Sequence, residues 1–124
     1  MTPLDTTETD IMWIFLSDSF LSIVDKGDPS GATLLVRARV AGDIERVFPG
    51  VTAVEGAGTD YRYRARVDRQ IVAEKLTAEL RSLRYANFKS TVKDRRRHEA
   101  YLEVWDAMMD YQSDLRRLKD SNAK

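Results

Sequence analysis

Two short runs of the sequence place an arginine at every second position, a spacing that can gather positive charge on one surface. The five residues are Arg37, Arg39, Arg62, Arg64 and Arg66. Each guanidinium carries a permanent charge and five N–H donors, so it suits the paired oxygens of phosphates and carboxylates. Aromatic rings beside such charges, here Trp13 and Phe15, would offer flat surfaces for bases. These seven side chains are the candidate ligand-binding site.

β-Strands must position the arginines, because successive strand side chains point to opposite faces. In residues 34–40 aliphatic side chains alternate with the first two arginines. In residues 61–67 the other three arginines alternate with Tyr61, Tyr63, Ala65 and Val67. Both runs predict strands whose apolar positions, Tyr61 included, face the core and whose arginines face outward. If the two strands are neighbours, the five guanidinium groups share one face of a sheet.

A plainer interpretation is that the arginines are solvated outward positions on a charged sheet face. Like charges on neighbouring strands repel each other unless acids pair with them. Four carboxylates lie nearby in the sequence, namely Asp43, Glu45, Glu55 and Asp60. Ion pairs with these acids would leave a surface with no particular affinity for a ligand. The sequence leaves both interpretations open.

The remaining segments predict further strands with short connections. Residues 12–16 and 20–24 are apolar on both faces and flank a polar turn, which predicts a β-hairpin covered on two sides. Gly42-Asp43 opens a short helix that ends at Pro49-Gly50, and a brief strand is expected in residues 51–55.

Two amphipathic helices are predicted after the last strand. Asp68 is a candidate N-cap, and the apolar stripe Val72, Leu76, Leu80 and Leu83 predicts a helix that covers the sheet. A second helix is expected from about Asp94 to Leu118, where apolar residues recur at spacings of three and four. They are Tyr101, Val104, Met108, Tyr111, Leu115 and Leu118, widened by Trp105. This heptad pattern predicts packing against the domain or against a second copy of the chain.

Together these elements predict an α+β fold: an antiparallel sheet of about four strands with two main helices on one face, ferredoxin-like in arrangement. The expected organisation is a single domain over residues 12–118, with flexible tails at residues 1–11 and 119–124. The heptad pattern and the two-sided hairpin contain more apolar side chains than a small core readily buries. A homo-oligomer, in the simplest case a homodimer, is therefore expected.

Other residues that could do chemistry form less specific patterns. Arg95-Arg96-Arg97-His98 is a second basic cluster, interpreted as a solvated helix start or as a docking point for a phosphate or a partner. His98 is the only histidine and the chain has no cysteine, so no thiolate or paired-histidine metal site is expected. Asp106, Asp110 and Asp114 are four residues apart, as on any polar helix face.

A glycine-rich segment and the overall composition exclude further classes. Gly56-Ala57-Gly58 lacks the extra glycines and the following helix of a phosphate loop, so a turn is expected. The 20 basic and 20 acidic residues cancel, so no net charge attracts nucleic acid or an anionic membrane. Apolar runs are far shorter than a bilayer span, and the first residues do not resemble a signal peptide. We expect a cytoplasmic protein with no membrane partner, cofactor or metal.

Five segments carry a resemblance to other proteins. They are Met12-Trp13-Ile14-Phe15-Leu16, Leu34-Leu35-Val36-Arg37-Ala38-Arg39, Gly42-Asp43-Ile44-Glu45-Arg46-Val47-Phe48-Pro49, Asp60-Tyr61-Arg62-Tyr63-Arg64 and Asn87-Phe88-Lys89. In that order they resemble a family of small uncharacterised proteins of bacteria and their phages, over roughly residues 12–111. Proteins of that kind usually begin at the position of Met12. The resemblance implies a phage or mobile-element context and no activity, ligand or site residue.

Three functional hypotheses follow. The leading one is a non-enzymatic small binding protein that engages an anionic or acidic partner (a nucleotide, nucleic acid or acidic protein surface) through the arginine and aromatic sheet face. The second is a phage or defence-related inhibitor that acts by protein–protein binding. The third is an enzyme with an unfamiliar site around His98 and the carboxylates of the last helix, which is less expected because the chain carries no enzyme motif.

Overall fold

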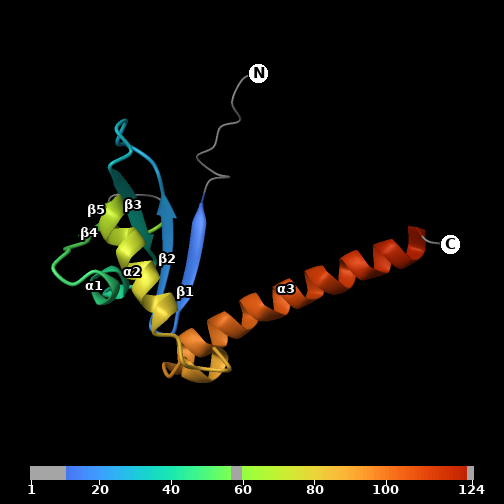
Figure 1. Ribbon diagram of the computed structural model, residues 1–124. Coiled ribbons are helices and arrows are strands. Elements are labelled where there is room, and N and C mark those ends of the chain that lie inside the picture. Colours follow the sequence, from blue (N-terminus) through green and yellow to red (C-terminus); the bar gives the residue numbers. More distant parts are fainter. Residues whose placement is uncertain (1–10, 57–59, 123–124) are drawn as a thin grey trace, which may run out of the picture. The chain divides into compact units, whose positions relative to one another are not determined.

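The computed structural model describes residues 11–56 and 60–122 (Figure 1). The strands are β1 (Met12–Leu16), β2 (Ser19–Val24), β3 (Thr33–Ala38), β4 (Val54–Glu55) and β5 (Tyr63–Asp68). The helices are α1 (Asp43–Val47), α2 (Arg69–Arg81), the 3-10 turn η1 (Lys89–Thr91) and α3 (Arg95–Asn122). Residues 1–10 of the expected N-terminal tail, residues 123–124 of the C-terminal one and residues 57–59 of the glycine-rich turn lie outside the described residues.

The strands form one antiparallel sheet in the order β1-β2-β3-β5-β4. The predicted α+β class and antiparallel sheet are confirmed, and the arrangement is consistent with a ferredoxin-like one. The described sheet has five strands, against an expected number of about four, because the two-residue β4 pairs with the outer edge of β5. β3 and β5, which carry arginines, are direct neighbours over six residue pairs.

The core lies on one face of the sheet, where alternate strand side chains meet α1 and α2. Its buried members are Leu21, Ile23, Val36, Ala38, Ile44, Val47, Phe48, Ala65, Val67 and Val72. Ile14 and Leu16 of β1 pack against this cluster, as the two-sided hairpin predicted. Burial of these apolar side chains is the main force that holds the sheet and the two helices together.

Helix α2 covers less of the sheet than its apolar stripe predicts. It lies along the sheet in Figure 1 and contacts β3 and β5, with Val72 buried and Leu76 packed against the core. The second half of the stripe does not pack, since Leu80 is 72% exposed and Leu83 is also exposed. The expectation that all four stripe residues cover the sheet is therefore wrong for these two, because only the first turns of the helix reach the strands.

A buried carboxylate fixes the β1–β2 hairpin to α1. Asp43 is 1% exposed, and its Oδ2 accepts a hydrogen bond of 3.0 Å from the backbone N–H of Phe20. Its other oxygen forms an ion pair with Arg46, whose Nε donates to the carbonyl oxygen of Asp18 at 3.1 Å. Asp43 and Arg46 thus hydrogen-bond to the backbone of the hairpin turn. These bonds fix the positions of the aromatic residues before and after the turn, Phe15 and Phe20.

The chain divides into two compact units, Met1–Arg84 and Tyr85–Lys124. The sheet, α1 and α2 belong to the first, and η1 and α3 to the second. Within the second unit the Phe88 and Tyr101 rings stack with centroids 5.9 Å apart. Helix α3 continues through Asn122, past the expected end at Leu118, because the residues that follow include good helix formers such as Lys119. The expected single domain stays a prediction.

Candidate functional site

A row of four side chains crosses the sheet on the face opposite the core. In the strand register Trp13 pairs with Ser22, Ser22 with Arg37, and Arg37 with Arg64. Paired residues point to the same face, and this row alternates with the buried Val36 and Ala65. The arginines of β3 and β5 therefore lie side by side. We call this surface, with the candidate residues on it, the arginine face.

Two of the other three arginines extend the row. Arg66 pairs with Leu35 in the register of β3 and β5, and Arg39, just beyond β3, lies over the Tyr61 ring as Arg37 does. Arg62 precedes β5, so the strand register does not fix its face. The Arg66 guanidinium donates to the carbonyl oxygen of Lys26 at 2.9 Å and to Thr33 Oγ1 at 3.2 Å. Arg62 and Arg66 are exposed, so their charges face solvent.

Tyr61 joins the arginines to the aromatic end of this surface, although the sequence pattern placed it in the core. The Cζ atoms of Arg37 and Arg39 lie 4.6 Å and 4.2 Å from the centre of its ring. Its hydroxyl accepts a hydrogen bond of 3.2 Å from Trp13 Nε1. Tyr61 is buried, with 4% of it exposed, as the inward prediction requires, but it packs against Arg37 and Arg39 and not within the core cluster. Since β5 begins at Tyr63, the alternation that holds for Ala65 does not constrain Tyr61.

Arg37 is the most buried arginine of the set. Only 7% of it is exposed, and its Nη2 donates to Ser22 Oγ at 2.9 Å. Its Nε has no hydrogen-bond partner among the described residues, and the same holds for the buried Nε of Arg64. Burial lowers the pKa of Arg37 from its usual value, and the positive charges of Arg64 and Arg39 act in the same direction. The group stays charged at any ordinary pH, so its burial costs free energy.

The charge of Asp60 acts on Arg37 and opposes the lowering of its pKa, but the expected counter-charges form no ion pair with the arginine face among the described residues. Asp43 pairs with Arg46, and a Glu45 oxygen lies 3.3 Å from the backbone N–H of Ala53. Asp60 offers Arg39 its carbonyl oxygen at 3.0 Å. Over residues 11–56 and 60–122, no ion pair joins the five face arginines to a carboxylate. The plainer interpretation, a sheet face of paired charges, is not supported for these arginines.

Aromatic rings form the β1–β2 end of the face. Phe15 stacks on Phe20 with centroids 4.5 Å apart, and Trp13 meets Phe20 edge-on at 6.1 Å. Trp13 is 59% exposed, so its indole presents a free surface beside the Arg37 row. The arrangement places a flat apolar ring and several uncompensated guanidinium groups on one surface, which is the chemistry that anions with a planar group require.

In the second basic cluster Arg95 pairs with Glu99 at 3.4 Å, but His98 is not brought together with Asp106 and Asp110. His98 Nδ1 lies 3.2 Å from the carbonyl oxygen of Val92, near the start of the helix. Eight residues of helix separate it from Asp106, which is about 12 Å along the axis. In the part of the chain that the structure describes, no three histidine or acidic residues are grouped so that they could hold a metal ion.

Two residues of the arginine face, Tyr61 and Ser22, were not recognised from the sequence. Ser22 could have been found, since it alternates with the buried Leu21 and Ile23 in β2. Tyr61 could not be found in this way, because it precedes the regular strand.

Comparison with family models, with curated proteins and with solved structures found no match for the chain. None of the helices in the described ranges has both the length and the apolar character needed to cross a bilayer.

Proposed function

We propose that this chain is a non-enzymatic binding protein that holds an anionic ligand with a planar group, such as a nucleotide, on its arginine face. The observation that carries the proposal is the Arg37–Arg64 pair. The two like charges oppose each other directly across β3 and β5, each with a buried Nε that has no partner among the described residues. Such a pair costs stability in the free protein. A bound anion would offset that cost by accepting the unused N–H groups.

The neighbouring residues favour a compact ligand. Trp13 could stack on a base, while the guanidinium groups of Arg62, Arg64 and Arg66 bind the attached phosphates. The zero net charge of the chain gives no long-range attraction for a nucleic acid polymer. A nucleoside phosphate therefore suits the surface better than a long nucleic acid or an acidic protein, which are the other partners that the arginines could engage.

The proposal is tested by titrating ATP, and separately a short oligothymidylate, into the protein and measuring heat and Trp13 fluorescence. Arg64→Glu should weaken ATP binding about tenfold or more, because it removes a charged hydrogen-bond donor and adds a repulsive charge. The matched control is Arg81→Glu, which makes the same change at an exposed position of α2. Circular dichroism confirms that both variants are folded.

Equal affinity of Arg64→Glu and Arg81→Glu for ATP would contradict the arginine face as the site, and so would the absence of binding by the unmodified chain. Tighter binding of the oligonucleotide than of ATP would replace the nucleotide with single-stranded nucleic acid as the ligand. If the base stacks on Trp13, the Trp13→Phe variant loses the fluorescence change. This variant therefore distinguishes the signal of Trp13 from that of the second tryptophan, Trp105.

A second candidate function has one observation in its favour. The exposed apolar side chains of α3, such as Met108 and Leu118, form a surface suited to another protein. That surface fits the expected homo-oligomer and also the alternative of a phage or defence-related inhibitor. The third hypothesis, an enzyme around His98, gains no such support from the distances on α3. A cytoplasmic location stays a prediction.

A further inference from the structure

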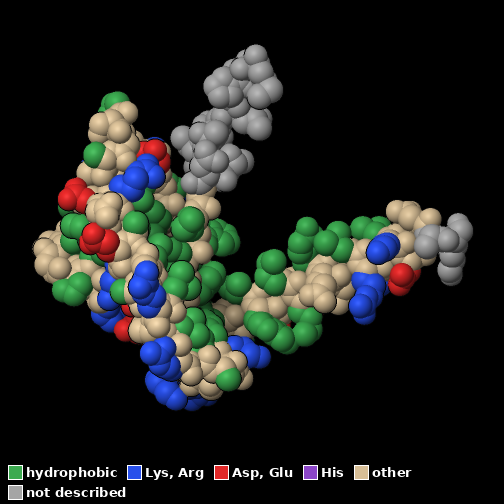
Figure 2. Space-filling view, viewed as in Figure 1, with side chains coloured by type: hydrophobic (Ala, Val, Ile, Leu, Met, Phe, Trp, Pro, Cys, Tyr) green, Lys and Arg blue, Asp and Glu red, His purple; other side chains and the backbone are tan. Residues whose placement is uncertain are grey.

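Helix α3 carries an apolar face that its own unit leaves largely uncovered. It has 28 residues, about 42 Å of helix at 1.5 Å per residue. Its exposed apolar residues are Val104, Trp105, Met108, Met109, Tyr111, Leu115 and Leu118, and Figure 2 shows hydrophobic side chains along much of its length. Helices of this kind derive most of their stability from packing of the apolar face. The face therefore needs an occupant.

The spacing of these residues is that of a coiled coil. Six residues alternate at intervals of three and four, as the a and d positions of successive heptads do. They are Tyr101, Val104, Met108, Tyr111, Leu115 and Leu118, and we call them the α3 seam. The stacked Phe88 already covers Tyr101, which is 9% exposed, so the free part of the seam begins at Val104.

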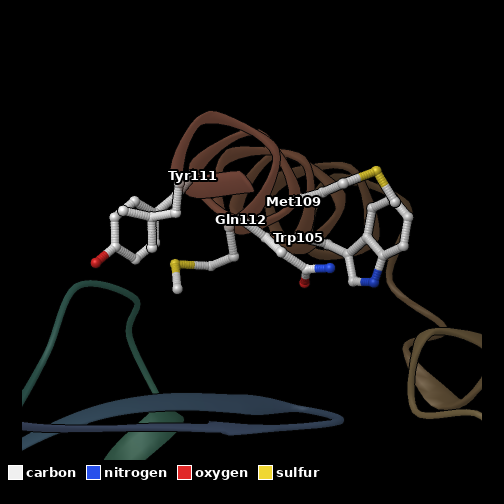
Figure 3. Close-up of a pocket in the computed structure, with 6 residues that line it drawn as sticks. Trp105, Met109, Tyr111 and Gln112 are labelled. Atoms are coloured by element: carbon white, nitrogen blue, oxygen red, sulfur yellow. The ribbon is translucent and has the colours of Figure 1, made fainter. Parts of the chain in front are cut away.

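A hollow of about 490 Å³, larger than any single side chain, lies on the seam. It is lined by Trp105, Met108, Met109, Tyr111, Gln112 and Leu115. Figure 3 shows Gln112 between the Tyr111 ring on one side and the Trp105 and Met109 side chains on the other. In a coiled coil such hollows receive a and d side chains of the facing helix.

The charge pattern excludes a lipid surface as the occupant. The acidic residues of the middle of the helix are Glu99, Glu103, Asp106, Asp110 and Asp114, and no lysine or arginine lies between residues 99 and 115. Helices that bind anionic membranes carry lysine and arginine on the polar face instead. The acidic face would be repelled there, and nucleic acid would be repelled for the same reason.

Two polar residues favour a second copy of the chain in parallel orientation. Counting Tyr101 as an a position, Asp114 is a g position and Lys119 is the e position five residues later. In a parallel pair of helices, g of one chain lies beside that e residue of the other. The Asp114 carboxylate, which pairs with Arg117 of its own helix, would therefore also meet Lys119 of the second copy on both sides of the seam. Asn122 occupies the next a position and is the last residue of α3. A buried asparagine at a favours parallel, two-stranded pairing in register.

We propose that α3 forms a parallel, in-register, two-stranded coiled coil with α3 of a second copy of this chain. Covering the exposed seam and the flanking residues would bury on the order of 700 Å² per chain, close to the ~800 Å² per partner of a stable interface. The outer acids at c and f positions, such as Asp106 and Asp110, stay in solvent. The pairing is independent of the arginine face, which belongs to the other unit.

The first experiment measures the oligomeric state of the full chain by light scattering after size exclusion. We expect a dimer for the unmodified protein and a monomer for Leu115→Glu, which buries a charge in the seam. Ser113→Glu introduces the same residue on the outer face of the same helix and should leave the dimer intact. A monomeric unmodified chain, or a Leu115→Glu variant that stays dimeric, overturns the proposal.

The second experiment determines the relative orientation of the two helices. Because the chain has no cysteine, an introduced cysteine is the only thiol that can form a disulfide. Leu118→Cys places one thiol at a d position, which meets its own copy only in a parallel, in-register pair. We expect a disulfide-linked dimer in most of the protein under mild oxidation and only traces for the Ser113→Cys control. In an antiparallel pair Leu118 would lie near Tyr101 of the second copy. Cross-linking that requires the Tyr101→Cys and Leu118→Cys changes together would therefore overturn the parallel arrangement.

The third experiment tests the charge pairing. Lys119→Glu turns two attractive g–e contacts into repulsive ones and should raise the dimer dissociation constant about tenfold. Combining Asp114→Lys with Lys119→Glu reverses both charges and should recover part of the lost affinity, since Asp114→Lys also removes the ion pair with Arg117 in the same helix. If the double variant dimerises no more tightly than Lys119→Glu alone, Asp114 and Lys119 do not meet across the interface and the proposed register is wrong.

Discussion

At Arg64 the stability of the fold and the proposed ligand binding make opposite demands. It faces Arg37 directly across the sheet, and its buried Nε has no hydrogen-bond partner among the described residues. In a protein whose sequence served stability alone, a β-branched or polar residue would suit this strand position better. A residue that costs stability within this row of arginines is consistent with the proposed binding surface.

Replacing Arg64 with threonine should therefore stabilise the protein by about 1 kcal/mol, because the repulsion with Arg37 and the unpaired N–H are both removed. The same change should weaken binding of ATP. Urea denaturation followed by circular dichroism measures the free energy of unfolding. Arg62→Thr lies just outside β5 and should stay within about 0.5 kcal/mol of the unmodified chain. A loss of stability in Arg64→Thr would show that the guanidinium is structural.

Individual side chains also show where sequence reasoning reaches its limit. The alternation in β5 correctly placed Ala65 and Val67 in the core and Arg64 and Arg66 on the opposite face. At Tyr61 it predicted a buried ring but not the ring's neighbours, because the chain has left the regular strand there and the ring packs against Arg37 and Trp13. Period-two patterns carry no information beyond the strand end, so contacts made by loop residues could not be predicted.

At the scale of elements, the β2–β3 loop holds one end of the arginine face in place. Asp28 accepts hydrogen bonds from the backbone N–H and the hydroxyl of both Ser30 and Thr33, at 2.6–3.0 Å. Gly27 has a φ of 86°, and a Cβ there would lie 2.7 Å from Arg66 Nη2. The positive φ therefore favours glycine at this position, and a side chain there would also displace the end of Arg66 from Lys26.

The loop should make stability depend on pH in the acid range. The hydrogen bonds from the Thr33 hydroxyl, and next the Ser30 hydroxyl, hold the pKa of Asp28 well below its usual value of 3.8. A lowered pKa in the folded state gives stability that is present above about pH 4 and is lost as the pH falls through the lowered value. Asp28→Asn should remove this part of the pH dependence. Thermal melts from neutral pH to about pH 2 test it.

Two graded variants check the cause of that pH effect. Thr33→Val should flatten the acid limb of the stability profile more than Ser30→Ala, because the Thr33 hydroxyl is the larger cause of the lowered pKa. If Asp28→Asn keeps the acid limb of the unmodified chain, the loop does not contribute to acid sensitivity.

Among the strands and helices, those with the most regular apolar patterns were predicted best. The strands with alternating or two-sided apolar patterns, and the helix that begins after Asp68, appear within about two residues of the expected positions. The exposed Leu80 and the helical end at Asn122 were not predicted. A periodic stripe shows which side of a helix is apolar and does not show how far the partner surface extends along it.

At the scale of the whole molecule, the two units carry different parts of the proposed behaviour. All ten buried residues of the core cluster lie between Leu21 and Val72, inside the unit Met1–Arg84. The arginine face belongs to the same unit. The α3 seam and its flanking charges lie in the unit Tyr85–Lys124. Ligand binding and self-association should therefore be separable by truncation.

A chain that ends at Arg84 should fold, bind ATP and remain monomeric, because it retains the complete core and the arginine face and lacks α3. Its free energy of unfolding should lie within about 1 kcal/mol of that of full-length Leu115→Glu, since both are monomers and association then adds nothing to either value. Urea denaturation, ATP titration and light scattering provide the three measurements. A truncated chain without a cooperative transition would show that the sheet depends on the second unit, and the single domain predicted over residues 12–118 would then describe the molecule better than two units.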